Sequence, residues 1–218
     1  MRKVRNSSRG TAKRRRRLDP DVRREQILSA ALVEFASRGF ATALMEDIAR
    51  RAGLSKGGLY AHFKSKDEVF EALLRRSLRP PEVDVSVWQE GRSGRDVIAL
   101  LVEDLYRALA RKDVVETLRL LIAEAPRVSD LVERWRADVI AGYEQRIGRV
   151  LQEGIRKKRL RRGIVTDEVW LFVVPVLRPI FMQMLNDPRG TAAYLAHQQD
   201  AHIEAMCELL LPPDKRRP

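Results

Sequence analysis

Cysteine, histidine and aromatic residues are scarce in this sequence of 218 residues, which contains one cysteine and three histidines. The single Cys207 excludes an intramolecular disulfide and a thiolate metal cluster, so a reducing cytoplasm is the expected compartment. No apolar signal segment follows the basic N-terminus, and no uninterrupted apolar run would span a membrane. These absences predict a cytoplasmic protein that uses no membrane, no metal and no other cofactor.

The histidines, the cysteine and the acidic residues do not occur at the sequence spacings that catalytic or metal-binding sites use. His62, His197 and His202 have no metal-ligand spacing with carboxylates, and the sequence places no base beside Cys207. No phosphate-binding loop occurs either, because the pair Gly57-Gly58 is too short. The histidines are interpreted as core or surface residues, and the chain is not expected to be an enzyme.

Positive charge is abundant and concentrated at one end. The net charge is +12, and residues 1–17 contain nine lysines or arginines and no acid, so the remaining chain carries only +3. Residues 1–18 are predicted to be a disordered basic arm, and residues 212–218 a short disordered tail. The run Arg14, Arg15, Arg16 and Arg17 is a candidate for contact with DNA in the minor groove. The alternative is a solvated tail without a partner.

Residues 45–66, MEDIARRAGLSKGGLYAHFKSK, have the spacing of a helix-turn-helix. Ala49 is small enough for a second helix to cross close to it, and Gly53 can adopt the positive φ that ends the first helix. Leu59 is placed to pack back onto Ile48 and Ala52. The alternative is a helical hairpin inside an all-α core, which uses the same small residues for packing alone.

The start of the second helix favours the DNA-binding interpretation. Ser55 is a plausible N-cap, and the helix is expected to begin near Lys56 with free amides that suit phosphate. Gly57 and Gly58 each cost roughly 1 kcal/mol relative to alanine within a helix, so stability alone would not select them. Bare backbone there permits close approach to another surface, and further donors follow at Tyr60, His62, Lys64 and Lys66.

Helix signals extend this motif in both directions. Asp19-Pro20 starts a helix that ends at Gly39, and its apolar face is predicted to pack on the two helices of the motif. Ser65 and Glu68 form a capping box that starts a helix running to about Leu78. Pro80-Pro81 then marks a loop. The sequence predicts a DNA-binding domain over residues 19–80 and a second domain over residues 81–211.

The stretch from Asp21 to Leu78 resembles the DNA-binding domain of the TetR (tetracycline repressor) family of bacterial regulators. The matching residues are Gly39-Phe40, Met45, Asp47-Ile48-Ala49, Ala52-Gly53-Leu54-Ser55-Lys56-Gly57, Leu59-Tyr60, His62-Phe63 and Ser65-Lys66. The resemblance implies that Lys56, Gly57, Tyr60, His62 and Lys66 contact DNA, with Lys64 as a further candidate.

Three positions depart from the family pattern. Ala43 stands where the family usually has a threonine whose hydroxyl caps the helix and meets a phosphate, and Thr42, one residue earlier, is the candidate replacement. Gly58 replaces a polar residue and Ala61 a frequent aromatic one. Side chains that relatives can use on DNA are therefore missing at these three positions.

The second domain is predicted to be entirely helical, which gives an all-α fold of about nine helices. Apolar stripes recur over Val97–Leu109 and Val114–Ile122, and a long helix is expected from Pro126 to about Arg159. The segment Val169–Leu185 is apolar almost all round, so burial on both sides is expected, one side in the core and the other against a partner subunit. With the last helix, residues 191–211, it is predicted to build a homodimer.

By the family resemblance, a ligand pocket lies among the middle helices. Its candidates are aromatic or long side chains, with Arg178 as the charge that could meet an anionic ligand: Tyr106, Trp135, Trp170, Phe172, Arg178 and Met182. The alternative is that these residues form the core. Glu124, before Pro126, is interpreted as a polar group at a helix end.

Together these features predict a dimeric, sequence-specific transcription regulator that binds a palindromic operator in double-stranded DNA. By family frequency it is a repressor, released when a small-molecule effector occupies the C-terminal domain. It would be cytoplasmic, and associated with the bacterial nucleoid when bound to DNA. The alternative is an architectural or division-linked DNA-binding protein of the same fold without an effector.

Overall fold

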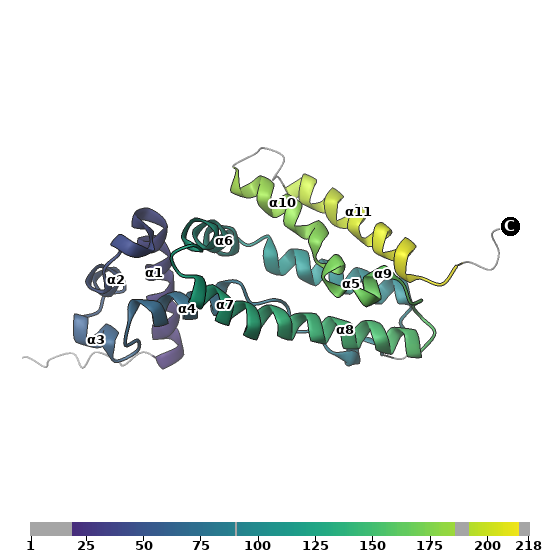
Figure 1. Ribbon diagram of the computed structural model, residues 1–218, viewed down its shortest axis with the longest axis horizontal. Coiled ribbons are helices and arrows are strands. Elements are labelled where there is room, and N and C mark those ends of the chain that lie inside the picture. The colour runs from purple at the N-terminus through teal and green to yellow at the C-terminus, as the bar shows by residue number, and fades with distance from the viewer. Residues whose placement is uncertain (1–18, 90, 186–191, 214–218) are drawn as a thin grey trace, which may run out of the picture.

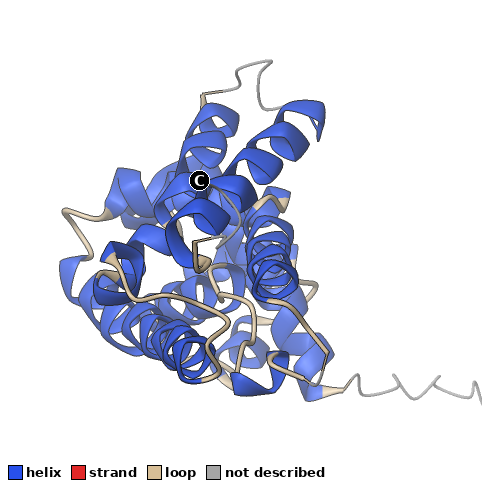
Figure 2. Cartoon of the chain, turned by 90° about the vertical axis from the view of Figure 1, so that its right-hand side faces the viewer, coloured by secondary structure: helices blue, strands red, loops and turns tan. Residues whose placement is uncertain are grey.

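The computed structural model describes residues 19–89, 91–185 and 192–213, which are all-α, with no strand in these ranges (Figures 1 and 2). The predicted fold class is confirmed. The helices are α1 (Pro20–Thr42), α2 (Met45–Arg51), α3 (Lys56–Tyr60), α4 (Lys66–Ser77), α5 (Gly94–Leu109), α6 (Lys112–Glu124), α7 (Ser129–Trp135), α8 (Ala141–Arg156), α9 (Ile164–Asp167), α10 (Val174–Met184) and α11 (Ala192–Leu210). Within the described ranges, no helix combines the length and the apolarity that crossing a membrane requires.

Helices α1 to α3 form a reading head at one end of an elongated molecule, and α4 leads from it toward the other helices (Figure 1). The Asp19 carboxylate accepts the amide of Asp21 at 2.9 Å and caps α1. Ser55 Oγ accepts the amide of Gly58 at 3.1 Å, which confirms the predicted start of α3. Ser65 Oγ caps α4 as predicted. The Glu68 carboxylate, however, accepts the amide of Lys64 at 2.7 Å instead of the amide of Ser65, so the second hydrogen bond of the predicted capping box is not formed.

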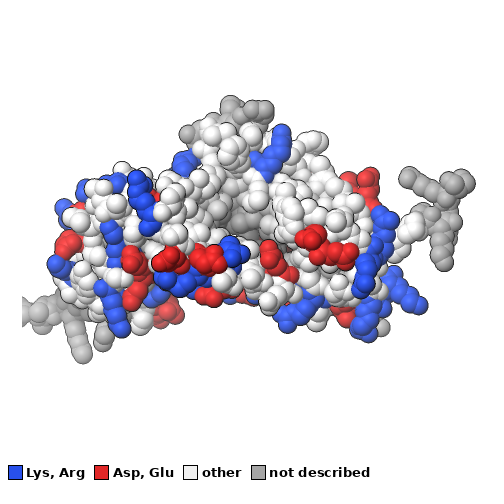
Figure 3. Space-filling model, viewed as in Figure 1, with Lys and Arg blue, Asp and Glu red and all other residues white. Residues whose placement is uncertain are grey.

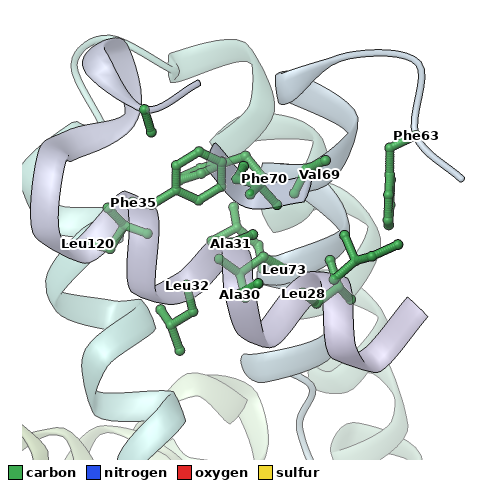
Figure 4. Close-up of a cluster of buried hydrophobic side chains, with 14 of the residues drawn as sticks. Leu28, Ala30, Ala31, Leu32, Phe35, Phe63, Val69, Phe70, Leu73 and Leu120 are labelled. Carbon is green, nitrogen blue, oxygen red and sulfur yellow. The ribbon is translucent and has the colours of Figure 1, made fainter. Parts of the chain in front are cut away.

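The core of the reading head extends into helices from beyond residue 80. Phe35 and Phe70 pack edge to face with ring centroids 5.6 Å apart, and Leu120 of α6 lies in the same cluster (Figure 4). Leu131 and Trp135 of α7 belong to it as well. α6 and α7 therefore complete the apolar face of α1 and α4, and the proposed domain boundary crosses a continuous core.

A polar joint connects the end of α1 to the end of α6. Glu124 is 6% exposed, and its Oε1 accepts the backbone amide of Phe40 at 3.3 Å. Gly39, the preceding residue, has φ +75° and interrupts α1, and a Cβ there would lie 2.8 Å from Glu124 Oε1. Arg127 pairs with the other carboxylate oxygen at 3.3 Å. The interpretation of Glu124 as a helix-end polar group thus agrees with its position, and its partner is the reading head.

The helix expected from Pro126 to about Arg159 starts later, ends earlier and is not regular. It comprises α7, a π-helical turn over Arg136–Ile140, and α8. α7 faces the first core, while Ile147 and Val150 of α8 belong to a second core with α5, α10 and α11. One long helix therefore serves both cores (Figure 1).

Two expectations for apolar segments are wrong. Ile122 does not share the buried stripe of α6, since its side chain is 62% exposed. The segment Val169–Leu185 is not one helix, since a 3₁₀ turn over Val169–Phe172 precedes α10. Only one side of it is buried within the chain. Its other side exposes five large apolar residues: Trp170, Val174, Leu177, Phe181 and Leu185.

Candidate functional site

The predicted DNA contacts cluster around α3 at the end of the reading head. Lys56, Gly57, Tyr60 and Lys64 are exposed there, and His62 is half-buried. Figure 3 shows lysine and arginine side chains distributed over this end of the molecule. A short helix with a free N-terminus, exposed glycine backbone and cationic neighbours is suited to lie against a phosphate backbone. Arg14 to Arg17 lie outside the described residues.

An acidic residue that was not identified from the sequence lies beside the first of these contacts. Glu46 Oε1, in the first turn of α2, is 2.6 Å from Lys56 Nζ. The hydrogen bond to Lys56 lowers the pKa of Glu46, and the same bond raises the pKa of Lys56. Both groups stay charged at neutral pH. The predicted contact of Lys56 with a DNA phosphate would therefore have to replace its ion pair with Glu46.

Lys66 performs a structural task in addition to any contact with DNA. Its Nζ donates to the carbonyl oxygens of Ala41 at 2.9 Å and Ala43 at 3.1 Å, and lies 4.7 Å from the centre of the Phe40 ring. The Ala41 carbonyl belongs to the last turn of α1, and the Ala43 carbonyl to the link between α1 and α2. Lys66 thus fixes that link from the start of α4, and one hydrogen of its ammonium group remains for another acceptor.

Thr42 does not cap α2, which is the role that the sequence suggested for it. The N-cap of α2 is Leu44, which makes no side-chain cap hydrogen bond, and Ala43 is fully buried. Thr42 is exposed at the last residue of α1. It is available to a phosphate but does not cap α2.

Two buried carboxylates hold α2 against α1 and were not identified from the sequence. Glu34 is 4% exposed, and its Oε1 accepts Arg51 Nε at 2.6 Å. Asp47 is 8% exposed, and its Oδ2 accepts Arg38 Nη1 at 2.9 Å. Each ion pair crosses between the two helices, so the orientation of α2, and through it of α3, depends on their charges.

Gly57 offers a direct test of close backbone approach to DNA. A Cβ at Gly57 meets no atom of the protein within 4 Å. We expect Gly57→Ala to leave the free energy of unfolding unchanged, or to raise it by up to about 1 kcal/mol, because alanine favours helix. Operator affinity, measured by fluorescence anisotropy, should nevertheless fall at least tenfold because the methyl group meets the DNA.

The matched control is Gly142→Ala in α8, where an added Cβ would also find room, with Arg146 Nη1 3.5 Å away. That variant should bind the operator as the wild-type chain does. Equal operator affinity of the wild type and Gly57→Ala would show that the α3 backbone stays away from the DNA.

Glu46→Gln tests the competition between carboxylate and phosphate. The exchange removes a negative charge from the DNA-facing surface and frees Lys56, so affinity for random DNA should rise about two- to fivefold per head, in the range of an exposed ion pair. Filter binding at several salt concentrations measures this change. Glu116→Gln is the matched control, because Glu116 pairs with Lys112 at 3.7 Å on α6. A decrease in random-DNA affinity for Glu46→Gln would contradict the competition.

A second candidate site is an apolar cavity of about 280 Å³. It lies between the residues that follow α4, the end of α5, the middle of α6, the end of α7, the π-helical turn, the start of α8, the 3₁₀ turn and α10. The centre of the face seen in Figure 3 is hollowed and surrounded mainly by uncharged residues. Leu78 and Pro80, which directly follow α4, line the cavity. It is close to the size of pockets that hold small ligands.

The sequence-predicted pocket residues divide into two groups. Trp135 and Trp170 line this cavity. Tyr106 and Phe172 lie instead in the second core, where the Tyr106 hydroxyl donates to the Gln198 carbonyl at 3.2 Å. Arg178 pairs with Gln198 Oε1 at 2.9 Å and with the Tyr194 hydroxyl, and Met182 is half-buried on α10.

The titratable groups of the second core are arranged for packing. Burial lowers the pKa of His202 to about 4, so the ring is neutral, and it lies between the rings of Tyr106 and Phe172 at 5.8 and 5.9 Å. Burial also raises the pKa of the Cys207 thiol. In the ranges that the structure describes, no group of three or more histidine, cysteine or acidic residues could hold a metal ion.

Comparisons with known proteins agree with this arrangement. Residues 27–73 match the family model "Bacterial regulatory proteins, tetR family", and residues 96–163 match "AefR-like transcriptional repressor, C-terminal domain". The chain is 30% identical over 162 residues to the repressor KstR2 of Mycolicibacterium smegmatis, covering 71% of this chain and 75% of that protein.

Two further matches differ in extent. The activator FasR of Mycolicibacterium smegmatis is 49% identical over 67 residues, but the match spans only 31% of each protein. The solved structure "SmeT-Triclosan complex" superposes with a TM-score of 0.67 at 22% identity, over 90% of this chain and 95% of that one. The relatives include both a repressor and an activator.

Proposed function

The chain belongs to the TetR family of bacterial DNA-binding transcriptional regulators, and on this premise we propose that it is a homodimeric repressor released from a palindromic operator by a small molecule. Two α3 helices, one from each subunit, would enter successive major grooves. The cavity beside α4 would hold the effector. On this proposal the chain has no catalytic activity of its own.

One observation carries the effector part of the proposal, namely that the cavity wall includes Leu78 and Pro80, which follow the end of α4. The same helix begins at Lys66, which holds the link between α1 and α2. A ligand that displaces the end of α4 therefore changes the position of the reading head. The effect requires only that the ligand bind one of two head positions more tightly than the other.

Ion pairs connect α4 to α7 and to the π-helical turn beside the cavity. Arg75 of α4 is 2.5 Å from Asp138 in the π-helical turn, and Glu71 is 3.5 Å from Arg134 of α7. Trp135 and Ile140, at the two ends of that turn, line the cavity. The cavity and α4 are thus connected both by the residues that follow α4, Leu78 and Pro80, and through the π-helical turn.

The exposed stripe of α10 supports the dimer. Five large apolar residues from Trp170 to Leu185 are 38 to 59% exposed and recur at intervals of three or four residues, and the first three of them also line the cavity. A contiguous apolar face of this kind on a helix is typical of a subunit interface. One small head makes few base contacts, so pairing two of them supplies the selectivity that a regulator needs.

The proposal is tested by binding the full-length chain to the promoter fragment next to its own gene. Fluorescence anisotropy in a large excess of random DNA should show specific retention, and mutating one half of the palindrome should weaken it. Adding ligand should release the fragment. Binding to every fragment with equal affinity would instead favour the architectural function.

The basic arm is expected to add salt-dependent affinity. Deleting residues 1–17 removes nine positive charges. For every phosphate that the shortened chain no longer neutralises, the slope of log affinity against log salt concentration should become shallower by about 0.9. The measurement compares both chains over a series of salt concentrations on the same operator, and an unchanged slope would identify the segment as a tail without DNA contacts.

A further inference from the structure

A basic loop, residues 156–162, forms a second concentration of positive charge at the end of α8. Its sequence RKKRLRR contains six lysines or arginines and no acid. All six of these side chains are exposed. When the basic loop and residues 1–17 are set aside, the rest of the chain has a net charge of −3. The excess positive charge of the protein therefore belongs to two segments, and only the first of them precedes the reading head in the sequence.

Packing and hydrogen bonds hold the basic loop in place. Leu160 is 4% exposed, and a Cβ at Gly94 would lie 2.5 Å from the Arg159 carbonyl oxygen, so only a glycine fits where α5 passes the loop. The backbone amide of Arg161 donates to the Leu210 carbonyl at 2.7 Å, at the end of α11. The loop thus presents its cations on a fixed backbone, which lowers the entropy lost when a partner binds.

Lys158 occupies a backbone conformation that stability alone would give to glycine. α8 ends in a Schellman motif, in which the amide of Arg159 donates to the Gly154 carbonyl and the amide of Lys158 to the Ile155 carbonyl, both at 2.9 Å. Lys158 has φ +56°, where a Cβ is unfavourably close to the following carbonyl oxygen. A cation is therefore present at a position where its side chain lowers the stability of the fold.

The described residues neutralise the basic loop only in part. Among them, Glu153 is the one carboxylate within ion-pair distance of the loop, at 2.6 Å from Arg156 Nη2 and 3.6 Å from Lys157 Nζ. Lys157, Arg159 and Arg92 line a hollow of about 410 Å³, and none of the described residues in its lining is acidic. This hollow gives a phosphate group room beside three cations.

The basic loop lies too far from the reading head to act on the same stretch of DNA. α7, the π-helical turn and α8 span 7, 5 and 16 residues, a length of about 40 Å at about 1.5 Å per residue. Salt screens charges beyond about 8 Å under physiological conditions. Figures 1 and 3 show that α8 ends opposite the reading head and that lysine and arginine side chains gather at that end. A partner of the basic loop is therefore a different molecule or segment from the DNA that α3 contacts.

We propose that the basic loop is a second DNA-binding surface, which binds the phosphates of a duplex other than the one at α3. A duplex fits better than a single strand, because the loop has no aromatic residue for a base to stack on and Trp88 beside it is 6% exposed. It also fits better than a membrane, because Leu160, the one apolar residue of the loop, is buried and cannot insert into lipid. One chain would thus join two duplexes. Joining them requires neither an effector nor a palindrome, so it does not depend on the proposed function.

A bridging assay with random DNA tests this surface. The full-length chain is mixed at about 50 mM salt with a biotinylated random duplex on beads and a fluorescent random duplex in solution. Fluorescence recovered with the beads measures bridging. The triple variant Lys157→Gln, Lys158→Gln, Arg159→Gln should recover at least about tenfold less fluorescence, because each lost phosphate contact weakens binding steeply at low salt. The amount of protein on the beads should change less than about twofold, since the reading heads still bind DNA.

The matched control is the triple variant Arg79→Gln, Arg107→Gln, Lys112→Gln. It removes the same charge from exposed ion pairs outside the basic loop, so it should bridge as the wild type does. Thermal melts establish that both triple variants are folded.

Lys158→Gly separates DNA binding from stability. Glycine suits the positive φ, so the melting temperature should rise by about 2–4 °C. Bridging should nevertheless fall severalfold, because a cation is lost. Unchanged bridging by this more stable variant would show that the Lys158 side chain does not contact DNA.

The remaining outcomes are equally decisive. Equal bridging by the wild type and the first triple variant would assign the bridging to the reading heads or to residues 1–17, and no bridging by any chain would also overturn the proposal. Absence of bridging together with binding to phosphatidylglycerol vesicles, lost in the same triple variant, would assign the basic loop to anionic lipid instead. Each of these results leaves the repressor proposal standing, because the promoter fragment tests that proposal separately.

Discussion

Replacing Phe181 by glutamate is expected to convert the protein to a monomer and to reduce operator affinity at least 100-fold. Phe181 is 51% exposed on α10 and does not line the cavity, so the fold of a single chain should tolerate the charge. In a two-fold interface the same residue occurs once in each subunit, so two unpaired carboxylates would be buried in the interface. The DNA-binding domains of two monomers then bind the two half-sites independently. They lose the increase in effective concentration that the dimer gives to the second domain.

Sedimentation velocity measures the oligomeric state, and fluorescence anisotropy measures operator affinity. Ile122→Glu is the control, since Ile122 is 62% exposed on α6 and its replacement adds the same charge away from the α10 stripe. A Phe181→Glu variant that stays dimeric with unchanged operator affinity would place the interface elsewhere.

Gly39→Ala is expected to lower the free energy of unfolding by about 2–6 kcal/mol. Gly39 has φ +75° and ψ 163°, a region that glycine alone adopts readily and where another residue costs about 1–3 kcal/mol. The added Cβ also lies 2.8 Å from Glu124 Oε1, so the carboxylate must move and release the Phe40 amide. Such overpacking costs typically about 1–3 kcal/mol more.

Urea denaturation of two further variants separates these contributions. Gly91→Ala has φ +87° but no atom within 4 Å of its Cβ, so it should cost only about 1–2 kcal/mol. Adding Glu124→Ala to Gly39→Ala removes the clash, and the two changes should couple favourably by about 1–2 kcal/mol. Equal costs for Gly39→Ala and Gly91→Ala would mean that the joint between α1 and α6 contributes no stability.

Local features of the reading head could be predicted from the sequence because they depend on residues close in the chain. Ser55 and Ser65 cap the helices that were assigned to them, and Gly53 has the positive φ expected at the turn. The all-α fold and the family follow from the same short-range patterns. The predicted DNA contacts and the domain limits remain predictions, although most of those residues lie at one end of the molecule.

Features that depend on contacts between distant residues could not be predicted in this way. Glu46 meets Lys56, and Glu124 meets Phe40, only because helices cross at particular angles. The cavity lining is a similar case, since Arg178 and Trp170 lie eight residues apart but only Trp170 lines the cavity. The helical spacing of the aromatic residues predicted that their side chains are buried. It did not predict which of them line the cavity and which lie in a core.

The π-helical turn over Arg136–Ile140 sets the rotational phase of the long helix. In a regular α-helix, Tyr143 would point about 80° away from Trp135, because eight residues exceed two turns of about 3.6. The wider π turn takes up the surplus residue, so the two side chains face the same way and both line the cavity. A chain one residue shorter within this turn would keep that alignment as a plain α-helix, whereas the same deletion inside α8 would rotate every later residue out of the second core.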